Sequence, residues 1–366
     1  MKQPLLITYE YLPQHGGIAK YLEQEVKNFE EDKNHQVRII HAQDYEMPLW
    51  PQWLPLVWRV RKYLVKGFRI PNKDSESLDA QCNSIWISHI LPIGYIALIY
   101  KKLFKIPYRV YLHGLDLVRP KKSKWKSFWV RKILNNADKI ICNSKATAQL
   151  LEYYDVKFNG SMGVSHLKIQ HPRVEKVSAK NYLQSGINLR KKYNLENKKI
   201  LLTVSRLVKR KGIDLVICAL PVIWKQIPGL VYVVIGDGEE RDNLRVIAKE
   251  CIHDCGNPAL IASDTGLTRR PEYRNPRNDS IIFTGAVSDE EKYGWLSTCN
   301  CFILTPRDDP NDFEGYGIVY KEAQMFNKPV IGSKVGGVTE AVGDDGVLVE
   351  PGDVEEITRA ILLNTK

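Results

Sequence analysis

The sequence lacks any long apolar run, and this excludes a helix that spans a bilayer. Such a helix needs roughly 18 or more consecutive apolar residues, and no stretch of the 366 residues approaches that length. The opening MKQPLLITYEYLPQHGG holds one lysine and a short apolar run that tyrosine, glutamate and proline soon interrupt. That run is too short for a signal peptide, so we expect a cytoplasmic protein.

Cysteine is also scarce. Seven cysteines, an odd number in a chain of this length, fit a reduced protein better than a disulfide framework. Cys251, His253 and Cys255 are close in sequence, but no second pair stands at ligand spacing. We therefore predict no metal site there.

The remaining composition is ordinary, with 44% apolar and 26% charged residues. These values exclude disordered, collagen-like and coiled-coil chains. At roughly 100–200 residues per domain, the length predicts two domains or one large one.

Acidic residues are few in the first half only. Residues 1–180 hold 29 Lys and Arg against 16 Asp and Glu, a net charge of +13, whereas residues 181–366 hold 24 against 26, a net charge of −2. The basic residues concentrate at 50–70, which has no acidic residue and three tryptophans, and at 119–132. Phosphates of nucleic acid and an anionic membrane surface both attract this pattern, and a solvated basic face is the third interpretation.

Helical spacing within 53–68 favours the membrane. The apolar residues at this spacing are Trp53, Leu54, Val57, Val60, Leu64 and Phe68. The basic residues that fall largely on the other side are Arg59, Arg61, Lys62 and Lys66. An amphipathic helix of this kind predicts that the first domain binds an anionic membrane surface, with peripheral association at the cytoplasmic membrane.

Short apolar segments alternate with helical patterns along most of the chain. The expected strands of the first half lie at 4–11, 36–42, 84–90, 108–114 and 139–142, and the alternation restarts at 199 after a polar stretch. This alternation predicts an α/β fold with two Rossmann-like doubly wound parallel-sheet domains facing across a cleft. We place the domains at 1–175 and 199–366, with a linker at 176–198 and a surface loop at 255–279.

The segment 305–342 carries the densest motif. Glu314 precedes Gly315, Tyr316 and Gly317, and Glu322 follows eight residues after Glu314, inside the next predicted helix. The glycines let backbone amides at the helix start approach a ligand, and these amides favour a phosphate or sugar oxygen. The two carboxylates are suited to accept hydrogen bonds from sugar hydroxyls.

A second cluster follows the buried strand at 199–206. Arg206 and Lys211 lie at its carboxyl end, where two cations can clamp a diphosphate and stabilise charge on a leaving group. Farther along, Gly236 and Gly238 resemble half of a dinucleotide fingerprint, but Arg241 occupies the place of the third glycine. We interpret these glycines as a tight strand-to-helix turn and predict no NAD site.

Taken in order, the motifs resemble one family. They are GG at 16–17, HG at 113–114, SR and KG at 205–212, GDG at 236–238, the paired glutamates at 314–322, and KPVI followed by GG and E at 328–340. This series is similar to the GT-B fold retaining glycosyltransferases of family four over nearly the whole chain. SRLVKRKG and EGYGIVYKEAQ are especially similar to bacterial phosphatidylinositol-mannoside mannosyltransferases, and the series also resembles glycosyltransferases of polysaccharide biosynthesis.

The resemblance implies a donor site. Glu322 matches the family glutamate that binds the donor ribose, and Glu314 the one near the transferred sugar. The backbone amides that contact sugar and diphosphate belong to Gly315, Tyr316, Gly317 and Ile318.

The resemblance also implies the catalytic groups, which are His113, Arg206, Lys211 and Glu314. Arg206 and Lys211 match the diphosphate clamp and replace a metal ion, so no cofactor or metal is expected. His113 lies near the outer hydroxyls of the sugar, and Gly16 and Gly17 leave room beside the donor. The expected reaction is retaining transfer of a hexose from a UDP- or GDP-sugar.

Three functions compete. The first is transfer to a lipid-linked or membrane-proximal sugar acceptor, and the second is transfer to a soluble small acceptor, which gives no reason for the basic first half. The third is a nucleic-acid-binding protein, which leaves the glutamates and cations unexplained, so we expect no nucleic-acid partner. Family members usually continue into a further helix that returns to the first domain, whereas this sequence stops at Lys366, soon after the predicted helix at 353–363.

Overall fold

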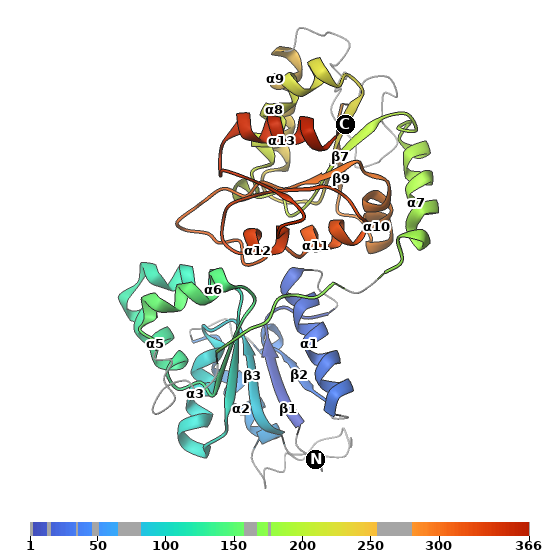
Figure 1. Ribbon diagram of the computed structural model, residues 1–366. Coiled ribbons are helices and arrows are strands. Elements are labelled where there is room, and N and C mark those ends of the chain that lie inside the picture. The colour runs from blue at the N-terminus through green and yellow to red at the C-terminus, as the bar shows by residue number, and fades with distance from the viewer. Residues whose placement is uncertain are drawn as a thin grey trace. The chain divides into compact units, whose positions relative to one another are not determined.

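The computed structural model divides the chain into two compact units (Figure 1). The residues it describes are 3–12, 16–33, 36–45, 51–64, 82–156, 167–174, 177–254 and 280–365. The first unit comprises Met1–Arg173 and Pro310–Tyr316, and the second comprises Val174–Asp309 and Gly317–Lys366. The expected loop at 255–279 lies outside the described residues.

The first unit is built on a parallel sheet of six strands. They are β1 (Gln3–Thr8), β2 (Arg38–His41), β3 (Cys82–Ser88), β4 (Tyr108–Leu112), β5 (Lys139–Cys142) and β6 (Leu167–Ile169). Their order across the sheet is β2-β1-β3-β4-β5-β6. The direction of winding therefore reverses between β1 and β3, and ligands of doubly wound sheets bind at such a reversal, beyond the carboxyl ends of the strands.

Helices cover both faces of this sheet. They are α1 (Gly17–Lys33), α2 (Leu54–Leu64), α3 (Ile93–Phe104), α4 (Leu115–Val118), α5 (Lys124–Leu134) and α6 (Lys145–Gln149). Leu5 and Ile7 of β1 pack in the core beneath α2, α3 and α5, whereas Leu6 faces α1. Burial on both faces explains why the strands read as continuous apolar runs instead of alternating ones.

Helix α2 corrects the interpretation of 53–68 as a membrane-inserted face. Val60 and Leu64 are buried in the core, and Trp53 and Val57 pack against it. Most of the apolar stripe therefore contacts the protein's own core, although Leu54 is 44% exposed. Helical periodicity indicates that a helix has an apolar partner, but it does not identify that partner. The residues of the predicted stripe and basic face that lie outside the described residues are Lys66 and Phe68.

The second unit contains another six-stranded parallel sheet. Its strands are β7 (Lys199–Val204), β8 (Leu230–Ile235), β9 (Ile281–Gly285), β10 (Cys301–Ile303), β11 (Val330–Ser333) and β12 (Val347–Val349), in the order β12-β11-β10-β7-β8-β9. The winding reverses between β7 and β10. With two parallel α/β sheets, the predicted fold class is confirmed.

Seven helices accompany the described part of this sheet. They are α7 (Ala179–Lys192), α8 (Ile213–Gln226), α9 (Arg241–Asp254), α10 (Asp289–Thr298), α11 (Ile318–Met325), α12 (Val338–Val342) and α13 (Val354–Asn364). Side-chain caps fix two of the starts: Ser288 accepts from the Glu291 amide at 3.2 Å, and Asp353 from the Glu356 amide at 2.8 Å. None of the helices in the described ranges is long and apolar enough to cross a bilayer.

Helix α7 replaces most of the linker predicted at 176–198. It packs closely on α10, because a Cβ at Gly186 would meet the Gly294 carbonyl oxygen at 2.7 Å. Arg190 secures the end of α7 by donating to the carbonyls of Thr298 at 2.6 Å and of Leu195 at 2.8 Å. The helix buries little apolar surface of its own, so its sequence reads as polar although the segment is ordered.

Candidate functional site

The predicted cations follow β7, at the winding reversal of the second sheet. Arg206 is exposed two residues after the strand, and Lys211 is buried in the short 3₁₀ turn that follows. Gly212 has a φ of +66° and lies so close to the Thr305 carbonyl that a Cβ there would overlap it. This close approach holds the turn against the end of β10.

The GDG turn after β8 packs against the same loop. A Cβ at Gly236 or Gly238 would overlap the carbonyl oxygens of Ser205 and Leu207. Arg241, at the place of the missing third glycine, pairs with Asp237 at 3.1 Å. The interpretation of these glycines as a tight turn is confirmed, because they make room for the loop that carries Arg206.

Arg307 is a third cation at this edge that the sequence analysis missed. It follows β10, its amide donates to the Arg210 carbonyl at 2.7 Å, and its guanidinium pairs with Asp214. Its position in the loop after a strand at the winding reversal is the signal that could have identified it.

Glu322 is buried in α11 and forms an ion pair. Its Oε1 lies 2.8 Å from Lys292 Nζ and 3.5 Å from the Tyr293 hydroxyl, and the side chain is 3% exposed. Lys292 is 10% exposed and also contacts Asp289 Oδ1 at 3.1 Å. Lys292 escaped the sequence analysis because, within the acidic run DEEK, it looks like a surface lysine.

The start of α11 is fixed to the sheet. Gly317 precedes the helix with a φ of +82°, and a Cβ there would meet the Tyr320 ring at 2.6 Å. The Tyr320 hydroxyl donates to the Leu304 carbonyl at 2.7 Å, just beyond β10. The first amides of the helix, beginning at Ile318, therefore lie at the strand-end edge of the sheet, where the helix dipole favours an anion.

His113 follows β4 in the first unit and is 8% exposed. Its Nε2 lies 3.0 Å from Ser88 Oγ, and the Tyr21 ring meets it edge-on at 5.6 Å between centroids. Burial, and secondarily the neighbouring His89, lower the pKa of His113 to about 3. The imidazole is therefore neutral at physiological pH.

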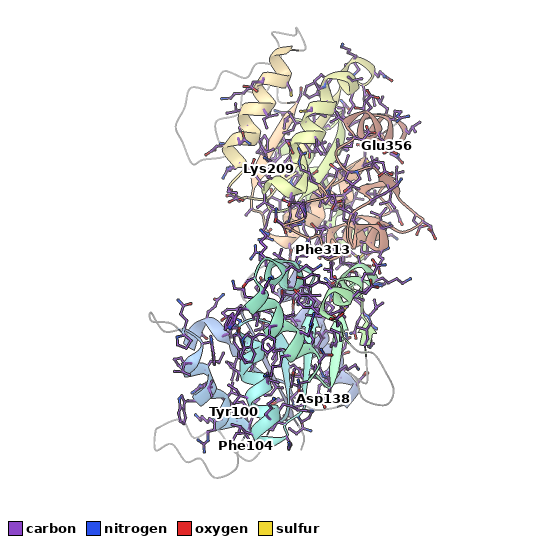
Figure 2. The ribbon with its side chains drawn as sticks, turned by 90° about the vertical axis from the view of Figure 1, so that its left-hand side faces the viewer. Tyr100, Phe104, Asp138, Lys209, Phe313 and Glu356 are labelled. Atoms are coloured by element: carbon purple, nitrogen blue, oxygen red, sulfur yellow. The ribbon has the colours of Figure 1, made fainter. Side chains whose placement is uncertain are left out.

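The turn after His113 is held by a carboxylate. Asp116 Oδ1 accepts from the His113 amide at 3.2 Å and the Gly114 amide at 2.9 Å. Burial raises the pKa of Asp116. Gly114 has a φ of +101°, and the ring of Phe313, labelled in Figure 2, occupies the space where a Cβ would lie.

Segment 310–316 belongs to the first unit, which corrects its prediction within 199–366. A Cβ at Gly315 would overlap the His113 carbonyl and meet Asn143 Nδ2 at 2.7 Å. Tyr316 stacks on His171 with centroids 5.2 Å apart. The chain at Glu314 thus passes beside His113, a contact between segments about 200 residues apart that no local pattern can predict.

Gly16 and Gly17 stand at the start of α1, after β1. A Cβ at Gly16 would lie 3.6 Å from Glu10 Oε2, whereas one at Gly17 would meet nothing within 4 Å. Glu10 itself approaches His89 Nε2 at 3.5 Å. Neither Glu10 nor His89 was predicted from the sequence, although they lie just after β1 and β3, the strands that flank the winding reversal.

The structure thus gathers the predicted residues into two sets. One set, in the first unit, comprises Gly16, Gly17, His113, Glu314, Gly315 and Tyr316. The other, in the second unit, comprises Arg206, Lys211, Gly317, Ile318 and Glu322.

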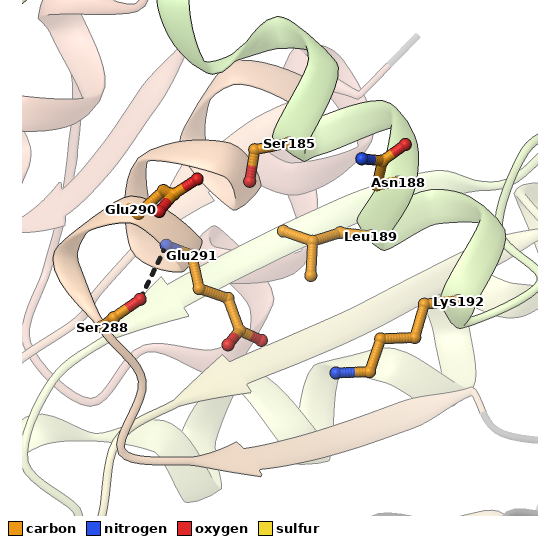
Figure 3. Close-up of a pocket in the computed structure, with 7 residues that line it drawn as sticks. All are labelled: Ser185, Asn188, Leu189, Lys192, Ser288, Glu290 and Glu291. Carbon is orange, nitrogen blue, oxygen red and sulfur yellow. Dashed lines mark hydrogen bonds between the residues drawn. The ribbon is translucent and has the colours of Figure 1, made fainter.

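A separate pocket of about 280 Å³ lies between α7 and α10 (Figure 3). It is lined by Ser185, Asn188, Leu189, Lys192, Ser288, Glu290 and Glu291, none of them a predicted site residue. No cluster of three or more metal-ligating side chains occurs among the described residues. The side chains of His253 and Cys255 lie outside them.

Family comparisons match both halves of the chain. Residues 198–363 match the model described as glycosyl transferases group 1, and residues 15–159 match that of glycosyltransferase family 4. The chain is 23% identical, over 98% of its length and 87% of the relative, to a GDP-mannose-dependent alpha-(1-6)-phosphatidylinositol monomannoside mannosyltransferase of Mycolicibacterium smegmatis. It is 24% identical, over 89% of its length and 70% of the relative, to the alpha-monoglucosyldiacylglycerol synthase of Streptococcus pneumoniae.

Solved structures share the fold. HepE of Anabaena, solved with UDP and glucose, aligns over 99% of this chain and 89% of its own, with a TM-score of 0.66 and 18% identity. Sucrose-phosphate synthase of Thermosynechococcus elongatus aligns over the same shares, with a TM-score of 0.66 and 19% identity.

Proposed function

The chain belongs to the family-four glycosyltransferases with the GT-B fold, enzymes that use nucleotide sugars, and on this basis we propose that it transfers a hexose, with retention, to a lipid-linked or membrane-proximal sugar acceptor. The relatives named above act on a phosphatidylinositol mannoside and make a glucosyldiacylglycerol, which supports a glycolipid acceptor. Both GDP-mannose and a UDP-sugar are candidate donors.

The buried Glu322 carboxylate carries this proposal. It is held by Lys292 within a helix whose amide end lies on the same sheet edge as Arg206 and Lys211. In the proposed complex, Glu322 accepts hydrogen bonds from the ribose hydroxyls, because an ionised carboxylate has acceptor capacity beyond its ion pair.

The two cations, Arg206 and Lys211, assist the departure of the diphosphate. As the bond from the sugar to the diphosphate breaks, negative charge grows on the diphosphate, and Arg206 and Lys211 stabilise it in place of a divalent ion. In the first unit, His113 is neutral and contacts a hydroxyl of the transferred sugar, with the Glu314 segment beside it.

A donor panel tests the proposal. GDP-mannose, UDP-glucose and their nucleotides are screened by thermal shift and by nucleotide release. In calorimetry, Glu322→Ala should then weaken binding of the preferred nucleotide by about 1.5–3 kcal/mol, roughly 10- to 150-fold, the contribution of hydrogen bonds to a charged group. Glu355→Ala, which removes an exposed carboxylate of α13, is the matched control. Equal affinity in both variants removes Glu322 from the ribose role.

Exposed aromatic side chains on the first unit support the membrane part of the proposal. Trp125 and Phe128 of α5 are 55% and 56% exposed, and Trp58 of α2 is 61% exposed. The exposed lysines around the α5 pair are Lys122, Lys124 and Lys126. Tryptophan accepts an interfacial position, and lysine is attracted to anionic headgroups.

Charge removal separates a membrane-bound acceptor from a soluble one. Each basic residue near an anionic surface contributes about 1 kcal/mol, so the variant with glutamine at Lys122, Lys124 and Lys126 should bind anionic vesicles about 100-fold more weakly. Its matched control replaces three exposed lysines of the second unit, Lys191, Lys192 and Lys198. If both variants bind vesicles as the parent does, transfer to a soluble acceptor becomes the favoured function.

A further inference from the structure

Four polar side chains form a continuous chain at the winding reversal of the first sheet. Glu10 follows β1, Ser88 ends β3, His89 directly follows β3, and His113 follows β4. Glu10 Oε1 lies 3.5 Å from His89 Nε2, His89 Nδ1 lies 3.4 Å from Ser88 Oγ, and Ser88 Oγ lies 3.0 Å from His113 Nε2. All three contacts fall within the first unit.

The Glu10 carboxylate determines which atom donates and which accepts in each of these hydrogen bonds. An ionised Glu10 can only accept, so a neutral His89 carries its proton on Nε2 and accepts at Nδ1. Ser88 has one hydroxyl proton, which it donates to His89 Nδ1, and its oxygen then accepts from His113 Nε2–H. With the opposite tautomer of His113, a lone pair of neutral His89 would face the carboxylate.

We propose that Glu10, His89 and Ser88 are positioning residues that hold His113 in the tautomer protonated on Nε2, so that its Nδ1 accepts a hydrogen bond from a hydroxyl of the transferred sugar. Among the described residues, His113 Nδ1 has no hydrogen-bond partner, so this lone pair is available to a ligand. The identity of that ligand rests on the proposed function, whereas the tautomer does not.

Neighbouring residues and the backbone conformation restrict the positions of these four side chains. Ser88 is fully buried, and the Tyr9 ring packs edge-on against His89 at 5.8 Å. His89 has a φ of +72°, a left-handed conformation that costs a residue other than glycine free energy. The strained residue is therefore the one whose ring contacts both Glu10 and Ser88.

Imidazole nitrogen spectra test the tautomer directly. Long-range ¹H–¹⁵N correlations of protein labelled with ¹⁵N-histidine, at pH 8, distinguish Nε2–H from Nδ1–H, and the His113→Asn spectrum assigns the signals. We expect the Nε2–H form in the parent and a mixture of tautomers in Ser88→Ala and Glu10→Met. Glu10→Gln, whose carbonyl still accepts, should keep the parent form, as should Glu31→Met, which removes an exposed carboxylate of α1.

Two results overturn the proposal at this stage. One is an Nδ1–H or doubly protonated His113 in the parent, and the other is an unchanged tautomer in both Ser88→Ala and Glu10→Met. Glu10 is partly exposed, so its replacement keeps the test decisive even where a change at buried Ser88 prevents folding.

A kinetic measurement tests the catalytic consequence. With the donor found by the panel, Ser88→Ala should lower kcat for nucleotide release more than tenfold and leave donor KM within twofold, since the nucleotide is assigned to the second unit. An unchanged kcat overturns the positioning role. If the panel finds no donor, the proposed function fails, and the spectra still decide the tautomer.

Discussion

Replacement of Lys292 by methionine tests whether Glu322 depends on its buried partner. The parent ion pair is 2.8 Å long, with side chains that are 10% and 3% exposed. Removal of one member of a buried pair costs about 3–5 kcal/mol, because the remaining charge has lost its compensation. For a unit of this size, that corresponds to a fall of roughly 6–20 °C in Tm.

The surface pair Lys334–Glu350 in the same unit provides the control. It is 2.5 Å long, but its side chains are 47% and 58% exposed, so Lys334→Met should lower the stability far less than Lys292→Met does. Lys292→Met combined with Glu322→Gln should recover most of the stability lost by Lys292→Met alone, because no buried charge is then left unpaired.

Calorimetric unfolding of each variant measures these differences, and titration with the preferred nucleotide measures the functional effect. We expect Lys292→Met to weaken nucleotide binding and Lys292→Arg, which keeps the charge, to weaken it less. A cost for Lys292→Met no greater than that of Lys334→Met would refute the reasoning, because Glu322 would then not depend on this partner.

Three further outcomes are expected. Because the pKa of His113 is lower in the folded state, the unfolded chain binds a proton at this residue first as the pH falls. The free energy of unfolding should therefore decrease by up to about 1.4 kcal/mol per pH unit from pH 6.5 towards pH 3. Urea unfolding of His113→Gln should not show this contribution. Gly236→Ala should destabilise the second unit by several kcal/mol, measured by urea unfolding, since the new Cβ overlaps the Ser205 carbonyl; a loss below 1 kcal/mol would contradict the packing described. Nucleotide release should survive EDTA because Arg206 and Lys211 replace a metal ion, and loss that magnesium or manganese restores would contradict the proposed clamp.

The sequence by itself determined the fold class and the positions of the main motifs. Apolar runs such as KILLTV and LVYVVI are typical of strands buried on both faces, and their alternation with helical patterns favours a parallel α/β sheet. The cations at 206 and 211 lie in the loop and turn after β7, and the glycines at 236 and 238 lie in the turn after β8, so the strand ends determine the edge of the sheet on which these residues lie. These relations hold between residues that are close in sequence, so they can be predicted from a single sequence.

Tertiary structure alone decided which partner each segment meets. The apolar stripe of α2 packs on the core instead of a membrane, α7 is ordered through glycine contacts with α10, and segment 310–316 joins the first unit. Lys292 meets Glu322 across 30 residues, and Ser88 meets His113 across 25. A sequence shows that a residue is apolar, charged or small, but the identity of its partner depends on how distant segments pack, and that is settled only when the whole chain has folded.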